Sequence, residues 1–215
     1  MIKGVIFDLD GVLVTTDELH YQAWKQMADR EGIPFDRAIN QRLRGVGRME
    51  SLDIILERAP RPITDPEKQA LATQKNDSYR ALLQQLTPAD LLPGAVEIVT
   101  ALRARGILTA IGSSSRNTPL ILDRLGLTPL FDAVADGNDI TRSKPDPEVF
   151  LLAAKRLGLP PESCVVIEDA VAGIEAARRA GMQVYGIGTP ETLPGVPRLA
   201  TGLAHVTVED LLATV

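Results

Sequence analysis

The sequence predicts an α/β protein in which a doubly wound parallel sheet carries an inserted helical cap domain. Three observations lead to this fold class. Strand-like and helix-like segments alternate beyond Pro93, an isolated apolar strand stands at Gly4–Phe7, and no convincing strand occurs in residues 15–88. Because the first strand belongs with the later ones, we assign residues 1–14 and 89–215 to a core domain and residues 15–88 to the cap.

Alternating elements are expected to build the core. Gly4–Phe7 is short, apolar and rich in branched and aromatic side chains, which is typical of a buried strand. Helices of suitable length stand between the later strands, so they would cover both faces of one parallel sheet. Further strands are expected at 107–112, 133–135, 164–167 and 183–187, helices at 94–105, 118–125, 147–157 and 170–180, and a last short strand and helix within 201–215.

The expected cap consists of helices. Its first helix begins with a Thr-x-x-Glu capping box, in which Thr15 is the N-cap and Glu18 the third helical residue, and it runs to Gly32. An insertion after the first strand would lie over the carboxyl end of the sheet, where folds of this class bind ligands, so it predicts an enclosed site. Further cap helices are expected around 41–43, 50–58 and 65–86.

Composition and charge narrow the classes of partner. The 215 residues carry a net charge of -5 with a pI near 5.1, which gives no basic field, so we expect neither nucleic acid nor a membrane surface as partner. The single Cys164 stands in an apolar strand and is expected to be a small buried hydrophobe. Asp8 and Asp10 interrupt the apolar N-terminus, so no signal peptide is expected. We therefore expect a cytoplasmic protein, as a monomer.

Two acids stand at the end of the first strand. Asp8 and Asp10 are separated by one residue, so the period of two in a strand would point both carboxylates to the same side. Burying like charges together is costly unless a cation lies between them or one of them is protonated. The pair therefore indicates a metal site or an acid/base pair, and two solvated acids in a turn are the alternative.

Three further strand ends carry polar residues. Ser113-Ser114-Ser115 lie between an apolar strand and a helix, a junction that suits an anion because hydroxyls and free backbone N–H groups converge there. Lys144 brings a positive charge to a loop after a strand, and Glu168-Asp169 end another apolar strand. A plain loop, a solvated lysine and a helix N-cap at Asp169 are the respective alternatives.

Parallel strands would deliver all four segments to one edge of the sheet. Carboxylates, a hydroxyl-rich anion site and a lysine suit phosphoryl transfer, in which a cation and a lysine neutralise charge. All-oxygen ligands suit Mg²⁺. Asp8, with an ordinary pKa of about 3.9, would be ionised near neutrality and serve as the nucleophile, while Asp10, if its pKa is raised, would protonate the leaving oxygen.

These four segments resemble the signature of the haloacid dehalogenase superfamily, in order and spacing, over nearly the whole chain. They read Asp8-Leu9-Asp10-Gly11-Val12, Ser113, Lys144-Pro145 and Glu168-Asp169. Within the superfamily the chain is similar to the β-phosphoglucomutase family. This narrower resemblance rests on Thr16, His20, Gly45-Val46-Gly47-Arg48, Lys75-Asn76-Asp77 and Ser115-Arg116-Asn117.

The resemblance implies a reaction and a role for each core residue. Asp8 would be the phosphorylated nucleophile and Asp10 the general acid and base. Asp8, Glu168, Asp169 and the carbonyl of Asp10 would hold Mg²⁺. The implied substrate is a small sugar phosphate, with interconversion of β-glucose 1-phosphate and glucose 6-phosphate through the 1,6-bisphosphate.

The same resemblance implies two phosphate sites. Ser113 and Lys144 would bind the phosphate in transfer, and Arg48, with residues 115–117, would bind the second phosphate. The implied set of substrate-binding residues is Thr16, His20, Trp24, Gly45, Val46, Gly47, Arg48, Lys75, Ser113, Ser115, Arg116, Asn117 and Lys144.

Residues of the cap also have plainer interpretations. The resemblance implies that His20 and Lys75 link closure of the cap to the position of Asp10. A single histidine on a helix is otherwise a solvated or core residue, and Arg48 could lie along a helix start with its charge in water.

Two rival functions use the same groups. A small-molecule phosphatase of this superfamily would let water, and not a sugar hydroxyl, attack the aspartyl phosphate, and Arg48 is the feature that favours the mutase. A non-enzymatic phosphoacceptor domain is more remote, because such domains lack an inserted helical block of this length.

Overall fold

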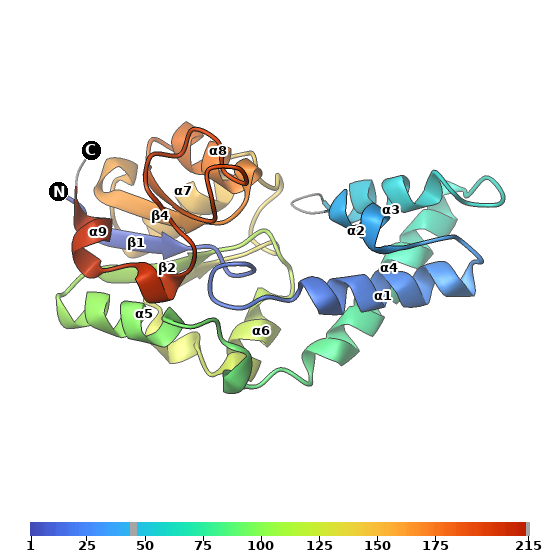
Figure 1. Ribbon diagram of the computed structural model, residues 1–215, viewed down its shortest axis with the longest axis horizontal. Coiled ribbons are helices and arrows are strands. Elements are labelled where there is room, and N and C mark those ends of the chain that lie inside the picture. Colours follow the sequence, from blue (N-terminus) through green and yellow to red (C-terminus); the bar gives the residue numbers. More distant parts are fainter. Residues whose placement is uncertain (44–46, 214–215) are drawn as a thin grey trace. The chain divides into compact units, whose positions relative to one another are not determined.

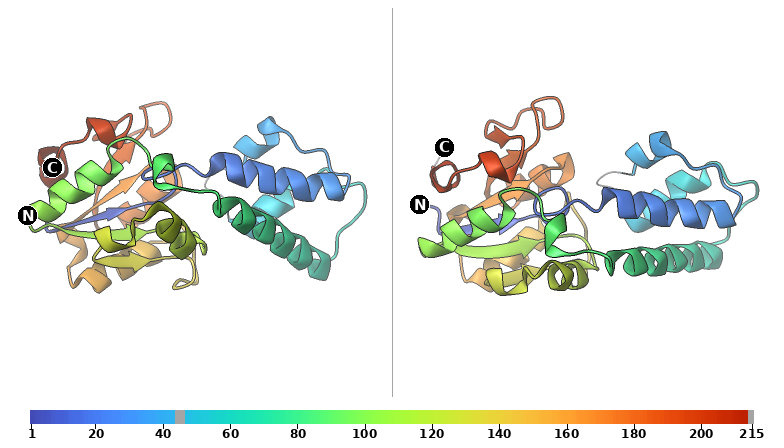
Figure 2. Two further views of the ribbon diagram at one scale, coloured as in Figure 1. Left: turned by 90° about the horizontal axis from the view of Figure 1, so that it is seen from below. Right: turned by 60° about the horizontal axis from the view of Figure 1, so that its bottom comes forward.

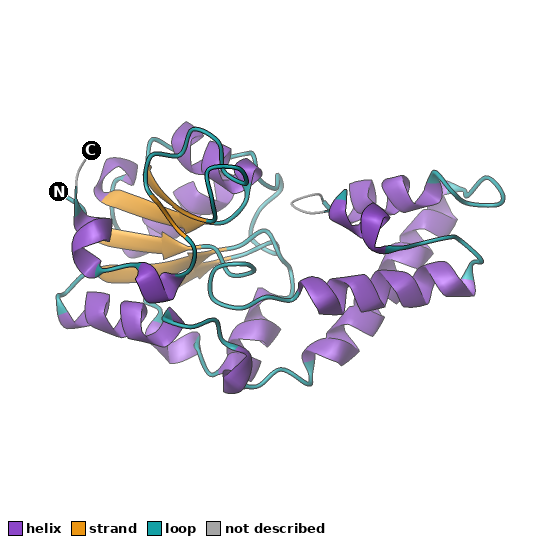
Figure 3. Ribbon diagram, viewed as in Figure 1, coloured by secondary structure: helices purple, strands orange, loops and turns teal. Residues whose placement is uncertain are grey.

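The computed structural model describes residues 1–43 and 47–213 (Figure 1). The chain divides into two compact units, Met1–Thr15 with Thr87–Val215, and Thr16–Leu86. All strands belong to the first, which we call the α/β unit, and we call the second the helical unit (Figure 3). Gly45 and Val46 lie outside the described residues.

A six-stranded sheet forms the centre of the α/β unit. Its strands run parallel in the order β3-β2-β1-β4-β5-β6. The central strands β1 and β4 are almost wholly apolar and fully buried, which is typical of strands covered on both faces. The strands are β1 Gly4–Phe7, β2 Leu108–Gly112, β3 Ala133–Ala135, β4 Cys164–Glu168, β5 Gln183–Ile187 and β6 Leu199–Ala200.

Helices cover both faces of this sheet. Helices α7 and α8 lie on one face, and α5 and α6 on the other (Figures 1 and 2). Beneath α7 and α8, Ile6 and Val166 of the strands pack with Phe150 and Ala177 of the helices. The predicted doubly wound fold class is therefore confirmed. The helices of this unit are α5 Ala95–Ala104, α6 Thr118–Leu125, α7 Glu148–Leu157, α8 Val171–Arg179 and α9 Val208–Leu212.

The helical unit has a core of its own. Trp24, Leu52 and Leu71, from three different helices, are buried together in it. None of its described residues forms a strand (Figure 3). Across both units, no helix within residues 1–43 and 47–213 has the length and apolar character needed to cross a membrane. The helices of this unit are α1 Asp17–Arg30, α2 Arg37–Gln41, α3 Arg48–Leu56 and α4 Asp65–Leu83.

The predicted capping box at Thr15 is wrong. The N-cap of α1 is Thr16, and its side chain makes no capping bond because its hydroxyl lies 2.8 Å from the Tyr79 hydroxyl. A capping box occurs instead at the start of α4, where the N–H of Thr64 donates to Glu67 at 2.7 Å.

Two element positions also differ from prediction. The helix expected around 41–43 is α2 at 37–41, because the carboxylate of Asp36 accepts from the N–H of Ile39 at 2.9 Å and caps an earlier start. The last strand, β6, ends at Ala200 and so precedes the 201–215 segment. Its pairing with β5 includes a bond from the N–H of Gly188 to the Ala200 carbonyl at 2.8 Å.

Phe150 and Leu151 are neighbours on α7 with opposite exposure, 0% and 39%. We expect Phe150→Ala to lower the free energy of unfolding by about 3–5 kcal/mol, because the lost ring leaves a cavity under the sheet. Leu151→Ala, the matched control, should change it by only about 0.5 kcal/mol. Urea denaturation measures both, and equal losses would contradict this packing.

Candidate active site

Strand ends of the α/β unit meet at one edge of the sheet. Phe7 of β1 pairs with Ile111 of β2 and with Ile167 of β4, so the three strands end level with one another. Asp8 follows β1 directly, and its N–H donates to the Ile167 carbonyl at 2.9 Å. Because the strands are parallel, the residues that follow them share this edge.

Lys144 lies between two carboxylates at this edge. Its Nζ is 2.5 Å from Asp8 Oδ1 and 2.7 Å from Glu168 Oε1. The side chains of Lys144, Asp8 and Glu168 are only 9%, 11% and 2% exposed. Lys144 is therefore not a solvated surface lysine, and the buried charges offset one another.

Asp8, Glu168 and Asp169 form what we call the acidic cluster. One oxygen of each carboxylate lies within 4.8 Å of the others. Two glycines make room for it, because a Cβ on Gly11, where φ is +86°, would collide with the Asp169 carboxylate, and a Cβ on Gly173 with that of Glu168. Three oxygen donors at this spacing fit a hard cation such as Mg²⁺.

Burial shifts the pKa values of these groups. Burial raises the pKa of Asp8 to about 7 against the opposing effect of Lys144, and burial with the charge of Glu168 raises the pKa of Asp169 to about 8. Burial alone would lower the pKa of Lys144, but the carboxylates of Asp8 and Glu168 raise it above its ordinary value. The prediction of an ordinary pKa for Asp8 is therefore wrong, and a cation would favour the ionised forms.

Asp10 lies in a tight turn after β1. It forms an isolated bridge with Val14, whose carbonyl accepts from the N–H of Gly11 at 2.7 Å. Asp8 is held beside β4 by its bond to Ile167, whereas this turn, and not strand alternation, sets the position of Asp10. Asp10 is half-buried, and its charge contributes to the raised pKa of Asp8.

In the segment from Ser113 to Asn117, serine hydroxyls accept hydrogen bonds from the segment's own backbone N–H groups. Ser113 Oγ accepts from the N–H of Ser115 at 3.2 Å, and Ser115 Oγ accepts from the N–H of Asn117 at 3.2 Å. The expectation of free backbone N–H groups is wrong at these two positions. Each serine hydroxyl can still donate its hydrogen to an anion. Ser113 and Asn117 are buried, and Arg116 is exposed.

The start of α8 shows that Asp169 is not a helix cap. The N-cap of α8 is Ala170, and its N–H donates to Glu168 Oε2 at 2.7 Å. Glu168 therefore bonds both this helix start and Lys144, while Asp169 completes the acidic cluster.

A second polar cluster lies inside the helical unit. Lys75 Nζ is 2.9 Å from His20 Nδ1 and 4.6 Å from the ring centroids of both Trp24 and Tyr79. Tyr79 stacks on His20 at 4.0 Å, and its hydroxyl lies beside that of Thr16. The sequence motifs did not indicate Tyr79, although its place four residues after Lys75 on α4 puts it on the same helical face.

Burial controls the charge of this cluster. Lys75 is 3% exposed, and burial followed by the charge of Arg48 lowers its pKa to about 7. Burial, and then Lys75 and Arg48, lower the pKa of His20 well below its ordinary value. His20 is therefore neutral at pH 7, and its Nδ1 accepts when Lys75 carries its full set of protons. Contacts of Thr16, Trp24 and Lys75 with a substrate remain predictions.

Arg48 is the exposed first residue of α3, and Gly47 is the N-cap of that helix. The Arg48 guanidinium donates to Asn76 Oδ1 on α4 at 2.9 Å. This bond holds its charge beside the helix that carries Lys75, which agrees with its effect on the pKa of that lysine.

A doubly wound sheet with a lysine-paired acidic cluster at its carboxyl edge defines the class as an α/β enzyme suited to phosphate chemistry. The family model of haloacid dehalogenase-like hydrolases matches residues 2–181. The chain belongs to the haloacid dehalogenase-like hydrolase family, as its four sequence segments indicate.

The relatives of this chain include a mutase and a phosphatase. The chain is 43% identical over 212 residues to the β-phosphoglucomutase of Bacillus subtilis (strain 168), covering 98% of this chain and 94% of that protein. It is 35% identical to a fructose-1-phosphate phosphatase of Escherichia coli (strain K12), covering 86% and 95%. The crystal structure of β-phosphoglucomutase from Clostridium difficile superposes with a TM-score of 0.90 at 37% identity, covering 97% and 95%. The predicted resemblance is thus confirmed.

The acidic cluster should make stability depend on pH and on cations. In chelator, we expect Asp169→Asn to be more stable than the wild type, by a margin that grows as pH rises from about 4, the ordinary pKa, to 8. The sign follows because the carboxyl, whose pKa is raised to about 8 in the folded state, keeps its proton across this range while the unfolded chain releases it, and that release favours unfolding. The amide of the variant does not titrate, so the variant lacks this loss of stability.

Thermal denaturation of both proteins across this pH range, with and without excess Mg²⁺, measures the margin. Mg²⁺ should stabilise the wild type more than the variant, because a cation that is held by all three carboxylates favours the folded state. Asp123→Asn, at an exposed position of α6, is the control. A margin that does not vary with pH would contradict the raised pKa.

Proposed function

We propose that the protein is a Mg²⁺-dependent β-phosphoglucomutase that interconverts β-D-glucose 1-phosphate and D-glucose 6-phosphate through the 1,6-bisphosphate, as a cytoplasmic monomer. The observation that carries the proposal is the buried contact of Lys144 with Asp8 and Glu168, because phosphoryl transfer needs fixed charges around the reacting group. Similarity to a β-phosphoglucomutase along 98% of the chain supports this choice of reaction.

In the proposed reaction Asp8 is the nucleophile. One oxygen of its carboxylate bonds to phosphorus while the bond from phosphorus to the sugar oxygen breaks, and Asp10 gives that sugar oxygen a proton. In the opposite half-reaction a sugar hydroxyl attacks the aspartyl phosphate and gives its proton to Asp10. Ser113 and Lys144 bind the phosphoryl oxygens and offset their charge.

The proposed cation site consists of the acidic cluster and the carbonyl of Asp10. When bound, Mg²⁺ offsets negative charge on the carboxylates and on the transferring group. The raised pKa values of Asp8 and Asp169 support this site, because both carboxyls need a nearby positive charge to stay ionised.

A mutase must also hold the phosphate that is not in transfer. We assign this role to Arg48, together with Ser115, Arg116 and Asn117. The bisphosphate must bind in two orientations, so either of its phosphates has to be accepted at this position. A guanidinium suits this need, because its planar fork bonds any phosphate, whichever carbon bears it.

The other predicted site residues of the helical unit are proposed to act in its closure over the substrate or to line the substrate site. His20 and Lys75 would link closure of the helical unit to the position of Asp10, and Thr16, Trp24 and the Gly45-Val46-Gly47 segment would border the substrate. The buried contact between His20 and Lys75 supports a shared role for these two residues.

A sugar-phosphate phosphatase is the second candidate, and the similarity to a fructose-1-phosphate phosphatase favours it. One experiment separates the two. The protein is incubated with β-glucose 1-phosphate, Mg²⁺ and a trace of glucose 1,6-bisphosphate, and the products are analysed. A mutase gives glucose 6-phosphate, whereas a phosphatase gives free phosphate. No reaction at all would favour the remote alternative of a non-enzymatic phosphoacceptor.

Asp8→Asn should abolish turnover, because an amide cannot form the acyl phosphate. The variant should fold, since the substitution removes one carboxylate from the crowded acidic cluster. Steady-state assays and circular dichroism measure the two properties. Substantial turnover by a folded Asp8→Asn protein would refute the assignment of the nucleophile.

Arg48→Ala should reduce mutase turnover by about 100-fold or more, as expected for loss of a charged, bidentate contact of about 3 kcal/mol. Phosphorylation of Asp8 by acetyl phosphate should persist, because that small donor has no second phosphate. Arg48→Lys should recover part of the activity, since an ammonium lacks the planar fork.

Arg58→Ala is the matched control, because Arg58 is an exposed arginine just beyond the end of α3. It should leave both rates at wild-type values. Unchanged conversion of β-glucose 1-phosphate by Arg48→Ala would exclude the role in binding the second phosphate and would strengthen the phosphatase candidate.

A further inference from the structure

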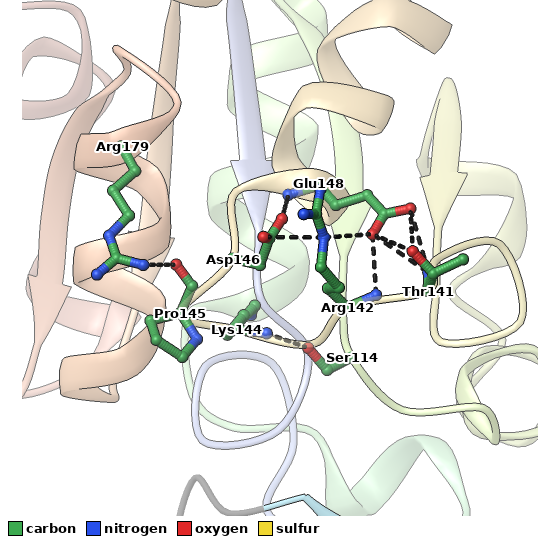
Figure 4. A network of polar contacts seen from close by, with 8 residues as sticks. All are labelled: Ser114, Thr141, Arg142, Lys144, Pro145, Asp146, Glu148 and Arg179. Atoms are coloured by element: carbon green, nitrogen blue, oxygen red, sulfur yellow. Dashed lines mark hydrogen bonds and ion pairs between the residues drawn. The ribbon is translucent and has the colours of Figure 1, made fainter.

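Glu148 folds the loop that carries Lys144. The segment between β3 and α7 contains no helix or strand, yet it has to deliver the Lys144 ammonium to Asp8 and Glu168. Glu148 is the first residue of α7. Figure 4 shows its carboxylate turned back onto Thr141 and Arg142, which precede the lysine.

Both oxygens of the Glu148 carboxylate accept bonds from this loop. Oε2 accepts from the N–H of Arg142 at 2.9 Å and from the Thr141 hydroxyl at 3.0 Å, and Oε1 accepts from the N–H of Thr141 at 3.1 Å. The N–H of Glu148 donates to Asp146 Oδ1 at 3.0 Å (Figure 4). The chain before Lys144 is therefore joined to the chain after it.

Other contacts also hold the loop, among them a bond from the N–H of Asp146 to the Ser143 carbonyl at 3.0 Å. The N–H of Lys144 donates to Ser114 Oγ at 3.4 Å, and Arg179 donates to the Pro145 carbonyl at 3.3 Å (Figure 4). Arg142 pairs with Asp146 at 3.1 Å, but its side chain is 72% exposed, so water weakens this pair. The Glu148 bonds tie residues 141 and 142, ahead of Lys144, to the first turn of α7.

We infer that Glu148 is a positioning residue for phosphoryl transfer, because its bonds to residues 141 and 142 set the place of the Lys144 ammonium against Asp8. The inference rests on the proposed function, in which Lys144 offsets the charge of the phosphoryl group. The side chain of a lysine is flexible. The position of its ammonium group therefore depends on how firmly the backbone of that lysine is held. Displacement of a catalytic group by about 1 Å can lower a rate about 100-fold.

A purely structural role for Glu148 would have a different signature. A carboxylate in the first turn of a helix stabilises that helix through its dipole. Glu97 is an exposed residue in the first turn of α5, so Glu97→Ala removes the same charge from the first turn of another helix. Loss of this stabilisation alone changes the melting temperature and leaves the rates of the folded protein unchanged.

The test follows two rates in the full chain with Mg²⁺, namely phosphorylation by acetyl phosphate, read from the mass of the intact protein, and turnover of β-glucose 1-phosphate. Glu148→Ala should lower both rates about 10- to 100-fold, with a smaller change in KM. Glu148→Gln should fall between, because its amide keeps one acceptor oxygen. Glu97→Ala should keep wild-type rates.

A double-mutant cycle completes the test. Once Lys144→Met has removed the ammonium, Glu148→Ala should cause no further loss of rate, because the two residues act together. Wild-type rates in Glu148→Ala, equal losses in Glu97→Ala, or full additivity with Lys144→Met would overturn the inference. If Glu148→Ala fails to fold, Glu148→Gln carries the same comparisons. A wild-type protein that neither accepts nor transfers phosphate would overturn the proposed function itself.

Discussion

One buried ammonium holds the acidic edge of the sheet together. Three carboxylates at the ends of β1 and β4 would repel one another, and Lys144 pairs with two of them at 2.5 and 2.7 Å. The surrounding strands and glycines make this contact possible. Level ends of β1, β2 and β4 bring the acids together, and Gly11 and Gly173 leave space for their oxygens. Without the lysine, the buried carboxylates would have to bind protons or separate.

The same contact leaves the site short of positive charge. Three carboxylates face one ammonium, and burial together with the repulsion among them raises the pKa of Asp8 to about 7 and that of Asp169 to about 8. A cation bound among these carboxylates would offset their repulsion in the folded state. Cation binding and folding are therefore thermodynamically linked. The buried lysine of the helical unit is in the opposite situation. Lys75 lies among aromatic rings, and its pKa is lowered to about 7, so it loses its charge readily.

Sequence patterns predicted the sheet and the residues at its edge because each depends on local order along the chain. The sequence itself shows apolar segments that lead to Asp8, Ser113 and Glu168. The carboxyl ends of parallel strands meet at one edge of the sheet, so these residues are expected there together. Two of the failed predictions depended on contacts or burial that arise only in the folded chain. The Thr16 hydroxyl meets Tyr79, a residue 63 positions away, so a local capping rule failed there. The ordinary pKa assumed for Asp8 was wrong because burial and neighbouring charges arise only in the folded chain.

The two units have separate hydrophobic cores, and the chain passes between them from Thr15 to Thr16 and from Leu86 to Thr87. Substitutions in the core of the helical unit can therefore be absorbed by repacking there, without disturbing the core beneath α7 and α8. The helical block is a module that can diverge at its own pace, or be exchanged between homologues at two fixed junctions. A changed helical block can then be inherited beside an unchanged acidic cluster.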